Sequence, residues 1–363
     1  MGKSLREKIG QLVMMGFSGT EVSPDCQEWI HEFQPGGVIL FSRNLQSPSQ
    51  VAALTNTLQS LSPSSPLLIA IDQEGGRVSR LPKGFTIFPP AATVSSCHSL
   101  QLAYDAAAVT AKELRAVGVN MNMAPVLDVN TNPANPIIGN RAFGKTPDQV
   151  GEYGVATMSG LQDHGVVACG KHFPGHGETS ADSHLELPVV TLGKERIEEI
   201  ELPPFRHAIE RGLASIMTAH VHYPALDKES PATLSYPILT DLLRNTLGFD
   251  GVVLTDDMEM QAILDHSSVG AASVRALQAG ADILLICHQQ DRQTEAIYAV
   301  EQAIESGQLS MDRLDQTVQR VQQLKAQYVP SSQPSSPEHL QEVVGCSAHQ
   351  QVLNTILETT NVS

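Results

Sequence analysis

The segment from Lys171 to His184 holds the most unusual group of chemically active side chains in the sequence. It reads K-H-F-P-G-H-G-E-T-S-A-D-S-H and places three histidines and two acids among small, turn-forming residues. One residue separates Asp182 from His184, so in an extended loop both side chains point to the same side and the carboxylate can hold one imidazole nitrogen. The other nitrogen can then donate and recover a proton near neutral pH. This spacing predicts an Asp–His acid/base pair.

Asp256 is the candidate chemical partner of that pair. It ends the apolar run of residues 251–256, and a rigid strand end can aim a carboxylate at an electrophilic carbon, which makes Asp256 a candidate nucleophile. By strand alternation, Asp257 is expected to point elsewhere and to cap the next helix. A carboxylate nucleophile with a positioned proton donor is the apparatus of a retaining glycosidase, although the general scheme uses a second carboxylate where this chain has a histidine.

Two other interpretations of the histidine-rich segment stay open. It is also compatible with a solvated polar loop, or with a metal site, because clusters of His and Asp bind zinc. The sequence contains no HExxH helix motif, and no GxGxxG or GxxxxGK[ST] turn follows a predicted strand. We therefore expect no cofactor and no bound metal, and a metal-dependent barrel hydrolase is kept as an alternative.

The chain alternates short apolar runs with longer stretches of helical periodicity, which is the pattern of a parallel sheet with helical crossovers. Eight such pairs predict an α/β fold of the (β/α)8 TIM-type barrel class, rather than an open doubly wound sheet. The expected strands are residues 11–16, 37–41, 67–72, 120–126, 166–172, 215–220, 251–256 and 282–287. The expected helices are residues 24–34, 48–61, 100–117, 147–165, 193–212, 236–247, 268–280, 292–307 and 310–327. Helix stop signals stand at Gly118, Gly165, Gly212, Gly248 and Gly280.

Charged residues end four of the expected strands, where a buried parallel strand should be apolar. In a barrel these ends share one face, on which active sites lie, and the long loops at residues 128–146 and 173–192 belong to the same face. Each residue alone could instead cap a helix or form a structural salt bridge. Their convergence on one rim favours a functional site. The residues are Asp72, Lys171, His172, His220 and Asp256.

Composition restricts the class of protein. The 363 residues are 41% hydrophobic and 17% charged, as in a soluble globular protein, and the net charge of −16 disfavours nucleic acid and anionic membranes as partners. Five scattered cysteines without CxxC spacing favour a reducing compartment. No apolar run approaches the roughly 20 residues that a membrane-spanning helix needs. We therefore expect a cytoplasmic protein, with a monomer as the default oligomeric state.

A single catalytic domain with a short C-terminal tail is the expected organisation. Residues 1–329 form the barrel, and residues 330–363 form a linker and a helical tail. The linker prediction depends on the run P-S-S-Q-P-S-S-P at residues 330–337. The tail is too short for a core of its own.

The Lys171–His184 segment resembles the signature of the β-N-acetylglucosaminidases of glycoside hydrolase family 3, bacterial enzymes of peptidoglycan turnover. The G-H-G and D-S-H parts are specific, whereas K-H-F is shared with related β-glucosidases. The similarity covers residues 5–327. It extends through I-D-Q-E-G-G-R-V at 71–78, A-P-V-L-D at 124–128, N-R-A-F-G at 140–144 and T-D-D-M at 255–258.

The resemblance implies a role for each matching residue. Asp256 is the nucleophile, His184 the acid/base and Asp182 its orienting partner. A terminal sugar is gripped by a mixed set of charged side chains, which suits hydroxyl groups because they both donate and accept hydrogen bonds. That set is Asp72, Arg80, Arg141, Lys171 and His172. Arg77 is expected to be structural, and His176 and His220 either line the site or are structural.

The resemblance also implies a substrate: a terminal, non-reducing N-acetylglucosamine in muropeptides or cell-wall fragments, removed with retention of configuration. The alternatives are the metal-dependent hydrolase, a β-glucosidase-like glycosidase of the same family, and a non-catalytic sugar-binding protein. Many family members carry a second domain, and residues 338–363 resemble the helical lead-in to it.

Overall fold

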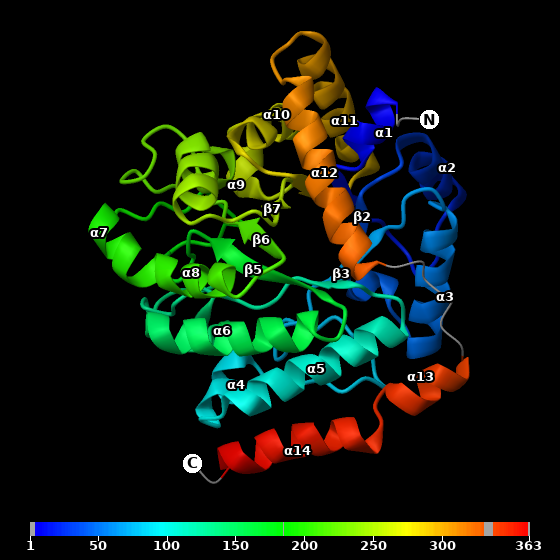
Figure 1. Ribbon diagram of the computed structural model, residues 1–363, viewed down its shortest axis with the longest axis vertical. Coiled ribbons are helices and arrows are strands. Elements are labelled where there is room, and N and C mark those ends of the chain that lie inside the picture. Colours follow the sequence, from blue (N-terminus) through cyan, green and yellow to red (C-terminus); the bar gives the residue numbers. More distant parts are fainter. Residues whose placement is uncertain (1–3, 184, 330–336, 362–363) are drawn as a thin grey trace.

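The computed structural model describes residues 4–183, 185–329 and 337–361 (Figure 1). Eight parallel strands close into a barrel in chain order, and β1 pairs with both β2 and β8. The predicted (β/α)8 barrel is therefore confirmed, with every expected strand present. The strands are β1 (Val13–Met15), β2 (Gly37–Leu40), β3 (Leu68–Ile71), β4 (Met121–Asn122), β5 (Val167–Phe173), β6 (Ser215–Thr218), β7 (Val252–Asp257) and β8 (Ile283–Ile286).

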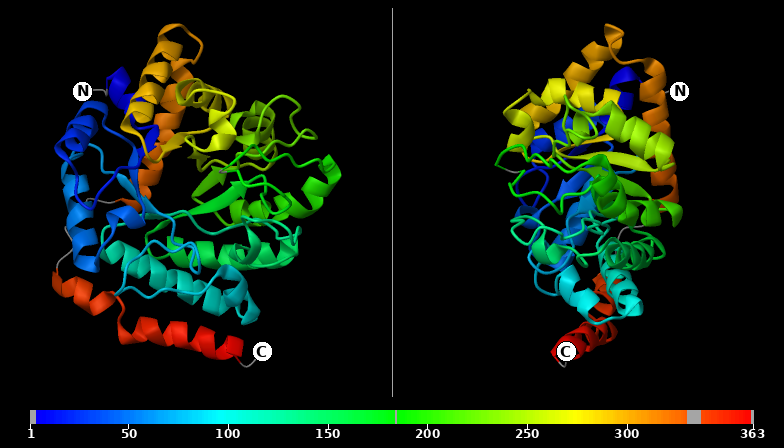
Figure 2. Two further views of the ribbon diagram at one scale, coloured as in Figure 1. Left: turned by 180° about the vertical axis from the view of Figure 1, so that it is seen from behind. Right: turned by 90° about the vertical axis from the view of Figure 1, so that its left-hand side faces the viewer.

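Helices surround the barrel (Figures 1 and 2). The α-helices are α1 (Leu5–Gly10), α2 (Pro24–Phe33), α3 (Pro48–Ser60), α4 (Ala91–Ser96), α5 (Leu100–Ala116), α6 (Pro147–Gln162), α7 (Lys194–Arg196), α8 (Leu202–Glu210), α9 (Gln261–Leu264), α10 (Val269–Ala279), α11 (Gln290–Glu305), α12 (Met311–Tyr328), α13 (Pro337–Val343) and α14 (Ser347–Asn361). The other helical segments are η1 (Ser42–Asn44), η2 (Gly139–Arg141), η3 (Ile197–Glu201), η4 (Ala232–Leu234) and η5 (Pro237–Thr246).

Local sequence signals set most helix ends. Ser23 and Ser47 precede a proline at the first helical position, and each hydroxyl accepts a backbone N–H of the first turn. The five predicted glycine stops all have positive φ, from 71° to 128°. The helix expected at residues 193–212 is instead divided into α7, the π-helical η3 and α8. Pro203 and Pro204 account for the division, because proline lacks an N–H and its ring crowds the carbonyl four residues earlier.

Successive strand residues belong to two apolar clusters. Met14 packs with Leu68 and Leu254 in a cluster drawn from the barrel strands, whereas Val13 and Met15 pack in the larger cluster that includes the helices. Both faces of each strand are therefore buried, which explains the nearly continuous apolar runs in the sequence. Because the strands are buried on both faces, polar side chains lie mainly at the strand ends.

The C-terminal helical segment (α13 and α14, residues 337–361) lies along the outside of the barrel helices (Figures 1 and 2). Helix α13 contacts α3 and α5, and α14 contacts α4 and α5. Leu340 and Ile356 are buried in these contacts. Residues 330–336 of the expected linker lie outside the described residues, so the division at residue 329 stays a prediction. Within the described parts of the chain, no helix is both long and apolar enough to cross a bilayer.

A buried carboxylate ties the last barrel helix to the strands at the end opposite the strand carboxyl termini. Asp282, directly before β8, is fully buried. Its Oδ2 lies 2.5 Å from Arg244, and its Oδ1 lies 3.4 Å from Arg313 and 3.3 Å from Arg320. Since Arg313 and Arg320 belong to α12, this carboxylate forms ion pairs with three cations and fixes α12 across the barrel end.

Removal of this carboxylate leaves three cations close together without their shared partner. Asp282→Ala is therefore expected to lower the free energy of unfolding by about 3–5 kcal/mol. Urea denaturation measures the change, and substitution of the exposed Asp250 by Ala is the matched control. A loss below about 1 kcal/mol, typical of an exposed ion pair, would contradict this account.

Candidate active site

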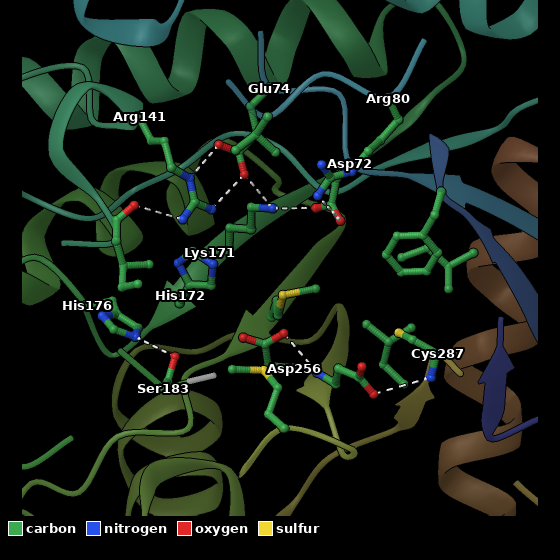
Figure 3. A pocket seen from close by; sticks show the side chains of 18 of the residues that line it. Asp72, Glu74, Arg80, Arg141, Lys171, His172, His176, Ser183, Asp256 and Cys287 are labelled. Carbon is green, nitrogen blue, oxygen red and sulfur yellow. Dashed lines mark hydrogen bonds and ion pairs between the residues drawn. The ribbon is translucent and has the colours of Figure 1, made fainter. Parts of the chain in front are cut away.

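A cavity of about 230 Å³ opens at the carboxyl ends of the barrel strands (Figure 3). Asp182 is half-buried in the loop after β5 and is not among the described residues that line the cavity, but its neighbour Ser183 is. His184 lies outside the described residues. Six predicted site residues line the cavity: Asp72, Arg80, Arg141, Lys171, His172 and Asp256.

Lys171, at the end of β5, joins two acidic side chains that follow β3. Its Nζ lies 2.7 Å from Asp72 Oδ1 and 2.7 Å from Glu74 Oε1. Arg141, from η2, binds the same Glu74 carboxylate through two contacts of 2.8 Å. The side chains of Lys171 and Glu74 are only 3% and 6% exposed. Four charged groups from three segments thus form one connected network along a wall of the cavity (Figure 3).

Burial and charge pairing oppose each other in this network. Burial raises the pKa of Glu74, but Lys171 and Arg141 outweigh it and hold that pKa well below its usual value. Burial lowers the pKa of Lys171, whereas Asp72 and Glu74 raise it, and the net effect is an increase. Glu74 and Lys171 are therefore both ionised at neutral pH. A fixed array of charged donors and acceptors is suited to a ligand rich in hydroxyl groups.

Arg80 supplies a donor that no other described residue uses. Its terminal nitrogen lies 3.9 Å from Asp72 Oδ2. Its Nε is buried and has no hydrogen-bond partner among the described residues. A buried donor without an acceptor is costly, so this group indicates a place for a polar atom of a ligand.

Asp128, at the start of the loop after β4, orients two histidines. Its Oδ2 lies 2.7 Å from Nδ1 of His172, and its Oδ1 accepts the backbone N–H of His176 at 2.6 Å. Burial raises the pKa of Asp128. The charge of His172 and these hydrogen bonds lower it by a larger amount, so the net effect is a decrease. The contact to Nδ1 leaves Nε2 of His172 for the cavity that the ring lines.

The first half of the loop after β5 is anchored by buried contacts. The side-chain amide of Asn135 donates to the carbonyls of His176 and Gly177, at 2.8 and 3.0 Å. A Cβ on Gly177 would lie 1.7 Å from the carbonyl oxygen of Val129, so only glycine fits. His176 Nε2 lies 3.1 Å from Ser183 Oγ. These contacts place the chain next to Asp182 at the wall of the cavity.

Asp256, the last but one residue of β7, faces the cavity. Its Oδ1 accepts the backbone N–H of Asp257 at 2.8 Å. Figure 3 shows its carboxylate on the other side of the cavity from the Lys171 network. A ligand between them would therefore meet a binding wall on one side and a carboxylate on the other.

Asp257 also lines the cavity, and the expectation that it caps the next helix is wrong. Its Oδ1 accepts the N–H groups of Glu259 and Cys287, at 3.1 and 3.3 Å, and its Oδ2 lies 3.3 Å from His288 Nε2. An irregularity in the pairing of β7 with β8 lies between Leu254 and Asp257 and interrupts the strict alternation on which the expectation depended.

Sequence reasoning did not assign a site role to Glu74 or Asp128. Both stand in the quoted motifs, and both carried a usable signal. Glu74 follows the strand-end residue Asp72 by two positions, the spacing that places two side chains on one side of an extended chain. Asp128 follows an apolar run, as Asp256 does. His288 had no such signal, since only the fold brings the loop after β8 to the cavity.

No group of three or more His, Cys, Asp and Glu side chains within residues 4–183, 185–329 and 337–361 is arranged to hold a metal ion. The two histidines of the H-x-H pair after β6 form hydrogen bonds with other protein groups. His220 contacts Thr233 Oγ1 at 2.8 Å and the carbonyl of Asp257 at 2.9 Å, and His222 contacts the carbonyl of Asp227 at 3.0 Å. Arg77 also has a structural contact, because it donates to the carbonyl of Ile137.

Comparisons with known proteins agree on one family. Residues 4–324 match the model of the glycosyl hydrolase family 3 N-terminal domain. A β-hexosaminidase of Nitrosomonas eutropha is 42% identical over 321 residues, which are 86% of this chain and 91% of that protein. The structure of a family 3 β-N-acetylglucosaminidase from Paenibacillus sp. FPU-7 is 44% identical with a TM-score of 0.95, over 99% of this chain and 69% of that one. Native NagZ from Neisseria gonorrhoeae is 30% identical with a TM-score of 0.81, over 96% and 97% of the two chains.

The buried His176 generates a pH prediction. Burial, and then the charge of His172, lower the pKa of His176 to about 4. Between that value and the usual 6.5, the unfolded chain binds a proton that the folded protein does not, so stability falls as the pH falls through this window. Between pH 7 and pH 4, the free energy of unfolding should fall less in His176→Gln than in the parent protein, by up to about 3 kcal/mol.

Urea denaturation at pH 7, 5.5 and 4 measures this difference. The exposed His31 provides the control substitution, His31→Gln, which should leave the pH profile unchanged. Parallel profiles for His176→Gln and the parent protein would show that His176 is not buried in its neutral form.

Proposed function

The chain belongs to glycoside hydrolase family 3 and is a glycoside hydrolase, and from this premise we propose that it is a retaining exo-β-N-acetylglucosaminidase. It removes a terminal, non-reducing N-acetylglucosamine through a covalent glycosyl-enzyme intermediate. The observation that carries the proposal is the cavity in which Asp256 faces the network of Asp72, Glu74, Lys171 and Arg141.

The charged wall supports recognition of a terminal sugar. Carboxylate oxygens of Asp72 accept hydrogen bonds from hydroxyl groups, whereas Arg80 and Lys171 donate to hydroxyl oxygens. The Nε2 of His172 can donate or accept, depending on where the ring carries its proton. Because the positions of these groups are fixed by buried ion pairs, little side-chain entropy is lost when the sugar binds. The open donor of Arg80 Nε gains its partner in the complex.

Asp256 is proposed as the nucleophile. In the first step, a carboxylate oxygen forms a bond to the anomeric carbon, the glycosidic bond breaks, and the leaving oxygen takes a proton from His184. In the second step, His184 removes a proton from water, the water oxygen attacks the anomeric carbon, and the Asp256 carboxylate is released. The negative charge of Asp256 also stabilises the oxocarbenium character of both transition states.

The Asp182–His184 pair is proposed as the acid/base unit, with Asp182 orienting the imidazole. Its support is the one-residue spacing in the sequence, together with the position of the intervening Ser183 at the cavity wall. A histidine suits this role because its ordinary pKa lies near physiological pH, so it can act as an acid in one step and as a base in the next.

Cell-wall fragments are the proposed natural substrate, namely N-acetylglucosamine linked to an anhydro-muramyl sugar with or without peptide. The support is the resemblance to the enzymes of peptidoglycan turnover. A β-glucosidase-like activity is the alternative within the family. The comparisons favour the N-acetylglucosaminidase, because the family 3 β-N-acetylglucosaminidase structure is 44% identical to this chain, whereas a β-glucoside phosphorylase structure is 27% identical.

Loss of either reacting group should abolish most turnover of an aryl N-acetyl-β-glucosaminide. Asp256→Ala and His184→Ala are each expected to lower kcat/KM at least about 100-fold. With a strongly acidic phenol as leaving group, His184→Ala should lose much less activity, because that oxygen leaves without protonation. Asp250→Ala, on the opposite face, is the control. Near-parent activity of Asp256→Ala would refute the assignment.

Two successive displacements at one carbon retain its configuration. Proton NMR during early turnover, before mutarotation, should therefore show the β-anomer of N-acetylglucosamine as the first product. First formation of the α-anomer would mean direct attack by water and would exclude a covalent intermediate on Asp256.

A further inference from the structure

A second buried carboxylate joins the C-terminal helical segment to the barrel. Glu113, on α5, is 1% exposed. It accepts the backbone N–H and the hydroxyl of Thr86 at 2.8 and 2.7 Å, the N–H of Gly345 at 2.9 Å, and lies 2.8 Å from His349 Nδ1. Four contacts satisfy a charge whose burial would otherwise be costly. Glu113 thus connects three pieces of chain: α5, the loop that follows β3, and the segment that includes α13 and α14.

The loop and the C-terminal segment approach each other at backbone distance. A Cβ on Gly345 would lie 2.2 Å from the carbonyl oxygen of Gly84, so no other residue fits there without a shift. Gln350 on α14 also donates to the Thr86 hydroxyl, at 3.0 Å. Such close approach leaves the loop little freedom to move independently of the segment.

One path of contacts leads from this junction to Glu74. The fully buried Ile356 of α14 packs in one apolar cluster with Phe88. The carbonyl of Phe88 accepts the N–H of Gly76 at 3.0 Å, and a Cβ on Gly75 would lie 2.6 Å from the carbonyl oxygen of Pro89. These two glycines directly follow Glu74 in the chain, so residues 86–90 form the support behind that carboxylate.

A second path leads to Arg141, the partner of Glu74. The thiol of Cys97, after α4, lies 3.7 Å from the carbonyl oxygen of Ile356. Ser95, on α4, donates to the carbonyl of Phe143 at 2.5 Å, two residues beyond Arg141. Both members of the buried Glu74–Arg141 pair are therefore held by segments that rest on the C-terminal helices.

We infer that the C-terminal helical segment is a brace for the sugar-binding wall, in which His349 and Ile356 are positioning residues that act through Thr86 and Phe88 on Glu74. The inference rests on the proposed function, since it concerns the grip on the terminal sugar. Asp256 projects from β7, on the other side of the cavity. A loosened brace therefore weakens sugar binding while the reaction at Asp256 keeps its geometry.

The test compares three substitutions in the full chain, at a temperature where circular dichroism shows all of them folded. With an aryl N-acetyl-β-glucosaminide, His349→Ala and Ile356→Ala should raise KM about fivefold or more and change kcat by less than about twofold. The inhibition constant of N-acetylglucosamine should rise in parallel. Leu357→Ala, an exposed apolar residue on the same helix, is the matched control and should change neither.

His349→Asn is the rescue variant, because its amide nitrogen occupies nearly the position of Nδ1 and can donate to Glu113. It should restore a near-parent KM. Parent-like KM and inhibition constants in both Ala variants, with only a lower melting temperature, would overturn the brace and leave the segment a structural cap. A fall in kcat at unchanged KM would also overturn it.

Hydrogen exchange separates this inference from the proposed function, because it needs no turnover. The amides of residues 74–80 should exchange faster in His349→Ala and Ile356→Ala than in the parent protein and in Leu357→Ala. Unchanged exchange in these peptides would refute the brace even if the activity on N-acetylglucosaminides is confirmed. Faster exchange without such activity would retain the brace and refute the function.

Discussion

A carboxylate that is almost fully buried needs compensation, and the way in which Glu74 obtains it organises the site. Lys171 comes from β5 and contacts Oε1 of Glu74, whereas Arg141 comes from the loop after β4 and contacts both carboxylate oxygens. Removal of either cation would take away part of the charge compensation of a buried carboxylate, at a cost of several kcal/mol. The three segments are therefore held in one arrangement, and Asp72 completes the wall through its own contact with Lys171.

The two sides of the cavity have different physical origins. The wall around Lys171 is held by ion pairs among several segments and by the layers behind them. The Asp256 side is held by the barrel itself, because its carboxylate stands directly on β7. Binding and reaction thus depend on different parts of the fold, and the cavity between them is the place where a bound sugar would meet both. The third component, the loop after β5, reaches this cavity through Ser183.

The alternation of apolar runs and amphipathic stretches was enough to predict the barrel, because burial on both faces imposes that pattern on each strand. Strand-end polarity likewise predicted Asp72, Lys171, His172 and Asp256, since the closed sheet brings those ends together. The two-residue spacing from Asp72 could have marked Glu74 as a site residue, but its burial could not be predicted, because it depends on two partners distant in sequence. Asp257 was placed wrongly because a local irregularity in strand pairing is not visible in a periodic pattern. The sequence also could not predict that Ile356 and Phe88 belong to one apolar cluster, because only the fold brings these two segments together.

The most direct test of the central claim is to trap the sugar on the protein. An activated 5-fluoro-N-acetylglucosaminyl donor reacts in the first step and turns over slowly in the second, so the intermediate accumulates. Intact mass followed by peptide mapping should then show one sugar residue attached to the peptide that contains Asp256. A label on a different carboxylate, or steady turnover of this donor with no adduct at any time, would contradict the account.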